Sequence, residues 1–140
     1  MQSKEKDNLV FVRLFPEEDI FDYLRDVCEK YNIETCVVLA GLGQLGSFEL
    51  GFFKEKGDYV PEQFTKSHEL LSLTGNISKQ ENGYNFHLHG TFSDINKKVV
   101  GGHFIKGVVS VTGEIVLMKT DLKITRKIEE DTGLSGLFLE

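Results

Sequence analysis

The second half of the chain alternates apolar and polar residues in short segments separated by turn residues. Side chains alternate between the two faces of a β-strand, so this pattern predicts half-buried strands of an antiparallel sheet. Two earlier segments also favour strands. One is rich in β-branched and aromatic residues, and the other is apolar on both faces, as is typical of a central strand. The predicted strands cover residues 8–14, 35–41, 47–53, 69–77, 84–92, 99–105 and 108–118.

One segment has a helical period instead. Its apolar residues share one helical face, and they are Ile20, Leu24, Val27, Cys28 and Tyr31. Pro16 suits a first helical turn, and acidic residues 17–19 follow it, where the positive end of the helix dipole favours them. We therefore expect a long helix packed on one face of the sheet. One helix followed by many closely spaced strands predicts an α+β domain with a central, mostly antiparallel sheet.

The stretch GLGQLG, residues 41–46, spells the G-x-G-x-x-G pattern of dinucleotide-binding loops. That pattern requires a strand, a turn and a helix in succession, whereas the next residues, SFELGFF, alternate as a strand. We therefore expect a tight bend between two strands, without a dinucleotide. The chain has no G-x-S-x-G, Walker or H-E-x-x-H motif, so no catalytic residue is assigned and a protein that is not an enzyme is favoured.

A length of 140 residues and a hydrophobic share of 40% suit one domain with a single core. We expect this domain to span residues 1–140, with its core in 8–120 and a C-terminal tail in 121–140. The tail is polar and then apolar, which predicts that it lies along the body or on a neighbouring subunit. Cys28 and Cys36 are expected to be small buried hydrophobes rather than a disulfide.

The net charge is −6 and the pI is about 5.2. Phosphate backbones are bound by clustered lysines and arginines, and close basic pairs occur here only at 97–98 and 126–127. Charge therefore argues against autonomous DNA binding but allows a role beside a DNA-binding partner. No apolar run approaches the roughly 20 residues that cross a bilayer. The N-terminal residues are charged, so we expect a cytoplasmic protein without membrane contact.

Three of the four histidines lie between residues 87 and 103. On a strand over 84–92, His87, His89 and Thr91 share one face, opposite the apolar residues. His103 joins that face if a three-residue loop, 95–97, places it directly across from His89. The apolar pattern favours this register, because it also sends the apolar neighbours of His103 to the core.

A second hairpin is predicted at Lys106-Gly107. It would bring Thr112 and Glu114 onto the histidine face. Three converging imidazoles can bind a divalent transition metal, for which zinc is the best candidate, with Thr91, Thr112 and Glu114 supporting its ligands. The alternative is that the histidines form a hydrogen-bonded polar row, buried at an interface between subunits.

The motifs VVLAGLGQLGSFELGFF, ELLSLTGNI, FHLHGTFSD and VVGGHFIKGVVSVTGEIVL occur in this order. Together they resemble the plants-and-prokaryotes-conserved (PPC) domain, in its bacterial single-domain form, which is related to a domain of plant AT-hook nuclear proteins. The resemblance implies a central antiparallel sheet, a homotrimer and a DNA-associated regulatory role. It also implies oligomer or partner contacts at Glu69, Leu71, Ser72, Gly101 and Gly102.

The chain departs from the plant pattern in two places. Lys66, Ser67 and His68 replace the first residues of the plant interaction motif, and no R-G-R-P AT-hook core is present, so minor-groove binding of that kind is not expected. We expect an oligomeric, DNA-associated PPC-domain protein with a three-histidine metal site. The alternative is a metal-dependent enzyme or small-ligand-binding protein that uses His87, His89 and His103.

Overall fold

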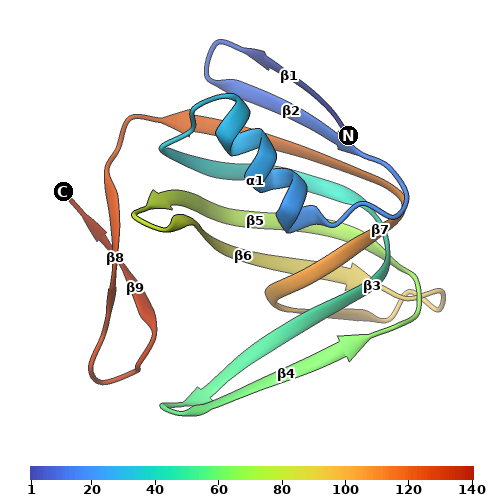
Figure 1. Cartoon of the computed structure of the whole chain (residues 1–140). Helices are drawn as coiled ribbons and strands as arrows, with labels where there is room; N and C mark the ends of the chain where they lie inside the picture. The colour runs from blue at the N-terminus through green and yellow to red at the C-terminus, as the bar shows by residue number, and fades with distance from the viewer.

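The computed structural model describes all 140 residues, as nine strands and one helix (Figure 1). In chain order the elements are β1 (Gln2–Lys6), β2 (Leu9–Leu14), α1 (Ile20–Lys30), β3 (Thr35–Glu55), β4 (Asp58–Phe64), β5 (His68–Gln80), β6 (Gly83–Ser93), β7 (Val99–Thr120), β8 (Ile124–Ile128) and β9 (Ser135–Leu139). The predicted antiparallel sheet is thereby confirmed. No helix is long and apolar enough to span a bilayer.

Seven strands form one antiparallel sheet in the order β1-β2-β7-β6-β5-β3-β4, and β7 pairs with β3 as well. The pairing of β7 with both β6 and β3 closes β3, β5, β6 and β7 into a ring. The β3–β4 hairpin projects from the body, and β8 and β9 form a separate hairpin at one end of the molecule (Figure 1).

Helix α1 is shorter than the sequence predicts and begins later. It has 11 residues, and Asp19 caps it by accepting hydrogen bonds from the backbone N–H groups of Phe21 and Asp22 at 2.8 and 3.2 Å. Pro16 and Glu17 lie in a turn before the helix, and Glu17 has a φ of 71°. Placing Pro16 in the first helical turn was wrong, because Asp19 supplies the cap three residues further on.

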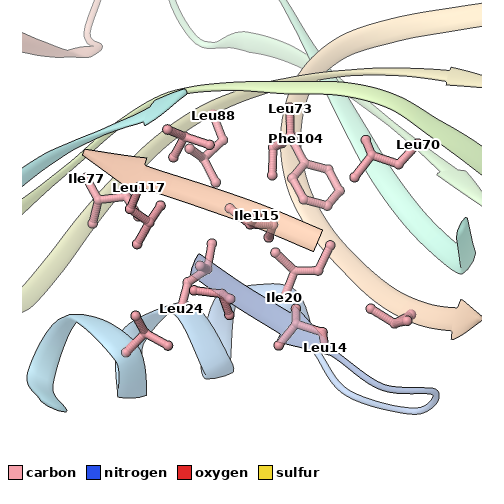
Figure 2. Close-up of a cluster of buried hydrophobic side chains, with 14 of the residues drawn as sticks. Leu14, Ile20, Leu24, Leu70, Leu73, Ile77, Leu88, Phe104, Ile115 and Leu117 are labelled. Carbon is pink, nitrogen blue, oxygen red and sulfur yellow. The ribbon is translucent and has the colours of Figure 1, made fainter. Parts of the chain in front are cut away.

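The apolar face of α1 covers the sheet as expected. Its four core residues, Ile20, Leu24, Val27 and Cys28, are fully buried. They pack with strand residues into one cluster of 22 buried side chains. Figure 2 shows Ile20 and Leu24 beside Ile115 and Leu117 of β7, with Leu88 of β6 beyond them. Cys36 is buried in the same cluster.

Two predicted turns are replaced by continuous strands. β3 runs through residues 41–46 with shifts of register, not a tight bend. β7 runs through Lys106-Gly107, so the predicted hairpin there is wrong. β3 pairs with β7 from Thr35 to Gly51, and a Cβ at Gly107 would lie 2.5 Å from the Phe104 ring. Gly107 therefore permits close packing and makes no turn.

Candidate metal centre

The β6–β7 hairpin has the register predicted from the sequence. His89 pairs with His103, and Thr91 pairs with Gly101. His87 lies two residues before His89 on β6, so both imidazoles project from the same face. Because Leu88 and Phe92 on the opposite face are fully buried, the core fixes the direction in which the histidines point.

The loop that sets this register is held by one aspartate. The side chain of Asp94 accepts hydrogen bonds from the backbone N–H groups of Asn96 and Lys98 at 2.8 and 2.9 Å. The backbone N–H of Asp94 also donates to the carbonyl of Lys98, at 3.0 Å. Lys97 takes a positive φ of 65°. These contacts close the three-residue loop 95–97, which places His103 opposite His89.

The three imidazoles form a nearly equilateral triangle. The ring centroids are 5.3 Å apart for His87 and His89, 5.5 Å for His87 and His103, and 5.4 Å for His89 and His103. One nitrogen from each ring can be chosen so that all three lie within 4.8 Å of one another. Tetrahedral zinc with bonds of about 2.0 Å needs nitrogens roughly 3.3 Å apart. Small ring rotations would therefore bring the nitrogens to ligand distance.

The surroundings keep two of the histidines in the neutral form that binds metals. Burial lowers the pKa of His87, and the charges of Arg126 and His89 lower it further. Burial is also the largest cause that lowers the pKa of His103, followed by His87 and His89. Neutral imidazole has a free lone pair, so a lowered pKa favours metal binding at neutral pH.

Strand β5 packs closely against the backbone of His87, and a glycine makes this close approach possible. Gly75 has a φ of 143°, and a Cβ there would lie 2.0 Å from the carbonyl oxygen of His87. No other residue fits at this spacing without moving β6. Gly75 thus allows β5 to approach the backbone that carries the first histidine.

The histidines line a cleft of about 830 Å³. Its walls come from β3, β4, β6, β7 and the β8–β9 hairpin, and none of the 14 lining residues is acidic. The residues are Gly51, Phe52, Phe53, Tyr59, Asn85, Phe86, His87, His89, Gly101, Gly102, His103, Arg126, Leu134 and Ser135. The ring of Tyr59 meets His103 edge-on, with centroids 6.0 Å apart.

Arg126 of β8 brings a positive charge to the cleft. Its guanidinium donates hydrogen bonds to Asn76 Oδ1 at 2.5 Å and to the carbonyl of Ser135 at 3.2 Å. Partial burial lowers the pKa of Arg126. Its backbone N–H donates to the side chain of Gln80, which ties β8 to β5 of the same chain. The tail thus lies along the body, one of the two placements expected.

Sequence reasoning missed Arg126 and Tyr59 as parts of this site. Arg126 lies in a tail with no motif, and its place depends on contacts with Gln80 and Asn76, which are 46 and 50 residues away. The available signal was the segment ITRKI, whose three β-branched residues favour a strand. Tyr59 follows the β3–β4 turn, and nothing in the sequence marks that hairpin as bending toward the histidines.

The residues expected to support the metal ligands lie in two different places. Thr91 lies on the histidine face, opposite Gly101, but does not line the cleft. Thr112 and Glu114 lie further along β7, where Glu114 pairs with Arg13 of β2 and Leu42 of β3. Neither residue lines the histidine cleft. The missing turn at 106–107 explains this, because β7 carries both residues away from His103.

The residues expected to form oligomer or partner contacts fall into two groups. Glu69, Leu71 and Ser72 lie on β5 at a shift of register, and the side chain of Leu71 is half exposed. Gly101 and Gly102 lie in the wall of the histidine cleft instead.

Comparison with known proteins relates this fold to a family. Residues 1–121 match the Plants and Prokaryotes Conserved (PCC) domain. Among curated proteins, the bifunctional protein GlmU of Synechococcus sp. (strain JA-2-3B'a(2-13)) is 27% identical over 131 residues, which cover 92% of this chain. The chain spans only 20% of the length of that protein.

Solved structures of this fold cover nearly the whole chain. A candidate DNA-binding protein from Bacteroides thetaiotaomicron VPI-5482 has a TM-score of 0.91 and 27% identity, over 98% of this chain and 96% of its own. A plant- and prokaryote-conserved (PPC) protein from Pyrococcus horikoshii has a TM-score of 0.81 and 27% identity, over 96% and 93%. A metal-containing protein from Archaeoglobus fulgidus has a TM-score of 0.84 at 24% identity, over 96% and 95%. The domain match over residues 1–121 and the motifs quoted from the sequence agree, and the chain belongs to the Plants and Prokaryotes Conserved domain family.

Proposed function

We propose that the protein binds one divalent transition metal ion, zinc by preference, through His87, His89 and His103. The observation that carries this proposal is the approach of three imidazole nitrogens to within 4.8 Å of one another at the edge of a cleft. Three nitrogen ligands leave a fourth position of a tetrahedral ion open to the cleft. The metal-containing Archaeoglobus fulgidus protein of the same fold supports the proposal.

The open position makes the metal a binding site for a small ligand. A bound zinc ion can polarise a ligand oxygen or lower the pKa of a bound water. Metal-assisted hydrolysis also needs a group that takes up a proton, and the walls of the cleft contain no carboxylate. Binding of a small ligand is therefore favoured over hydrolysis, and the alternative of a metal-dependent enzyme ranks second.

Metal analysis of protein purified without a histidine tag tests the site. We expect about one zinc ion per chain after incubation with zinc and gel filtration, and a loss of most of it in His89→Ala. His68→Ala is the matched control, because His68 packs against Phe48 and Phe64, outside the cluster. Equal zinc content in wild type and His89→Ala would contradict the proposal.

A DNA-associated role is a second candidate, supported by the similarity to the candidate DNA-binding protein from Bacteroides thetaiotaomicron. The net charge of −6 favours a role beside a DNA-binding partner over direct binding. Fluorescence anisotropy with duplex DNA at low salt tests direct binding, because non-specific dissociation constants fall at about 10⁻⁴ to 10⁻⁶ M. Binding in this range would favour a direct role, and its absence would leave only a partner-mediated one.

We also propose self-association, as the homotrimer implied by the family resemblance. The outer surfaces of β2, β3 and β7 carry exposed apolar side chains, among them Phe11, Leu42 and Val111, each more than half exposed. Apolar patches of this kind mark association surfaces. Sedimentation velocity should show a trimer for the wild type and a smaller species for Phe11→Glu. A monomeric wild type would contradict this proposal.

A further inference from the structure

Arg126 is a partly buried cation without an anionic partner. Its guanidinium donates to an amide oxygen and a backbone carbonyl, both neutral acceptors. It takes part in none of the five ion pairs of the protein, and its Nε is buried without a hydrogen-bond partner. Removing a charge from water is costly unless an opposite charge compensates it. A ligand with a negative group would supply that compensation.

The walls around Arg126 contain no negative charge that could compensate its guanidinium. The chain has 22 acidic residues, yet none of them lines the histidine cleft. A divalent metal on the histidines would add further positive charge beside Arg126. A cleft lined by charges of one sign attracts ligands of the opposite sign. The site thus favours anions in a protein that is acidic overall.

Much of the remaining wall is apolar. Phe52, Phe53, Tyr59 and Leu134 line the cleft, and the side chain of Phe52 is 68% exposed. Binding sites for small molecules combine such surfaces with a few polar groups that orient the ligand. An inorganic anion would leave these side chains in water, whereas an organic anion would cover them.

We propose that the cleft binds a small organic carboxylate with an apolar body, held by the guanidinium of Arg126 beside the metal. The planar fork of arginine matches the two oxygens of a carboxylate. This inference builds on the proposed metal site, but the contribution of Arg126 can also be measured without metal. Arg126 lies on the C-terminal hairpin, outside the residues 1–121 that match the domain family.

Benzoate is the probe, and benzamide is its neutral counterpart of the same shape. In calorimetric titrations of zinc-loaded protein, Arg126→Gln should bind benzoate at least tenfold more weakly than wild type. Benzamide should bind wild type at least tenfold more weakly than benzoate. Arg126→Lys, which keeps the charge but loses the fork, should lie between wild type and Arg126→Gln.

Two further variants separate the ligand contact from the stability of the hairpin. Lys127→Gln removes the neighbouring cation, which lies over the Phe138 ring and does not line the cleft, and it should leave benzoate affinity unchanged. Phe52→Ala alters the apolar wall without touching the hairpin. It should weaken benzoate binding and leave the binding of inorganic phosphate unchanged.

Each outcome supports or overturns the inference. Unchanged benzoate affinity in Arg126→Gln, or no benzoate binding to zinc-loaded wild type, would overturn it. Phosphate binding tighter than benzoate would overturn the assignment to an organic carboxylate. If the protein binds no zinc, the proposed metal site is wrong. The same titrations of metal-free protein then test whether Arg126 binds the carboxylate without a metal. Benzoate binding that is lost in Arg126→Gln would then support the inference, and no binding would overturn it.

Discussion

Replacing Gly75 with alanine should damage the metal site without touching a histidine. The new Cβ would lie 2.0 Å from the carbonyl oxygen of His87. The backbone would have to retreat by about 1.4 Å to reach ordinary van der Waals contact, which begins at 3.4 Å, whereas metal–ligand distances tolerate only about 0.2 Å. We therefore expect zinc affinity to fall at least tenfold in Gly75→Ala.

The same substitution should lower the stability of the fold. Gly75 has a φ of 143°, and a non-glycine residue held in such a sparsely populated region costs about 1–3 kcal/mol. The clash with β6 adds to this strain, so we expect a loss of about 3 kcal/mol in the free energy of unfolding. Urea unfolding followed by circular dichroism measures the stability of metal-free protein, and competition with a chelating dye measures zinc affinity.

Gly57→Ala is the matched control. Gly57 also has a positive φ, 81°, but a Cβ there meets nothing within 4 Å, and the residue lies in the β3–β4 turn. The Gly57→Ala substitution should lower the free energy of unfolding by about 1–2 kcal/mol and leave zinc affinity unchanged. Wild-type zinc affinity and stability in Gly75→Ala would refute the reasoning that β5 positions His87.

Three other predictions follow from the packing, the loop and the titrating groups. Leu88→Ala removes a fully buried side chain between the two histidines of β6 and should cost about 2–5 kcal/mol in urea unfolding. Asp94→Ala removes two hydrogen bonds that close the loop 95–97, and it should cost about 1 kcal/mol and weaken zinc binding. The pKa values of His87 and His103 are lowered from 6.5 in the folded protein. The unfolded chain therefore binds more protons than the folded protein. The free energy of unfolding of metal-free protein should be undiminished above pH 6.5 and should fall as the pH drops below that value. A double His87→Gln, His103→Gln variant should show a smaller decrease, and an equal decrease would contradict this assignment.

The features that local patterns encode were predictable from the sequence. Alternation placed the strands and the core faces, and the burial of Leu88 and Phe92 confirms which face of β6 points inward. The three-residue loop was predictable because its register also satisfies the apolar residues around His103. The convergence of the three histidines followed from that one register.

The features that depend on distant partners were not predictable. Lys106-Gly107 resembles a two-residue turn locally, but β3 pairs with β7 from His103 to Thr120, and this pairing keeps the strand continuous through both residues. Thr112 and Glu114 were therefore expected in the wrong place. Arg126 enters the cleft only because Gln80 and Asn76 hold β8 against β5, a contact that no local pattern reveals.

X-ray absorption at the zinc edge of zinc-loaded protein tests the central claim most directly. Coordination by His87, His89 and His103 predicts three imidazole nitrogens at about 2.0 Å, with the ring scattering typical of histidine, and one further light ligand. The same spectrum of His89→Ala should lose histidine scattering. Zinc surrounded only by oxygen, or a spectrum that does not change in His89→Ala, would contradict the three-histidine site.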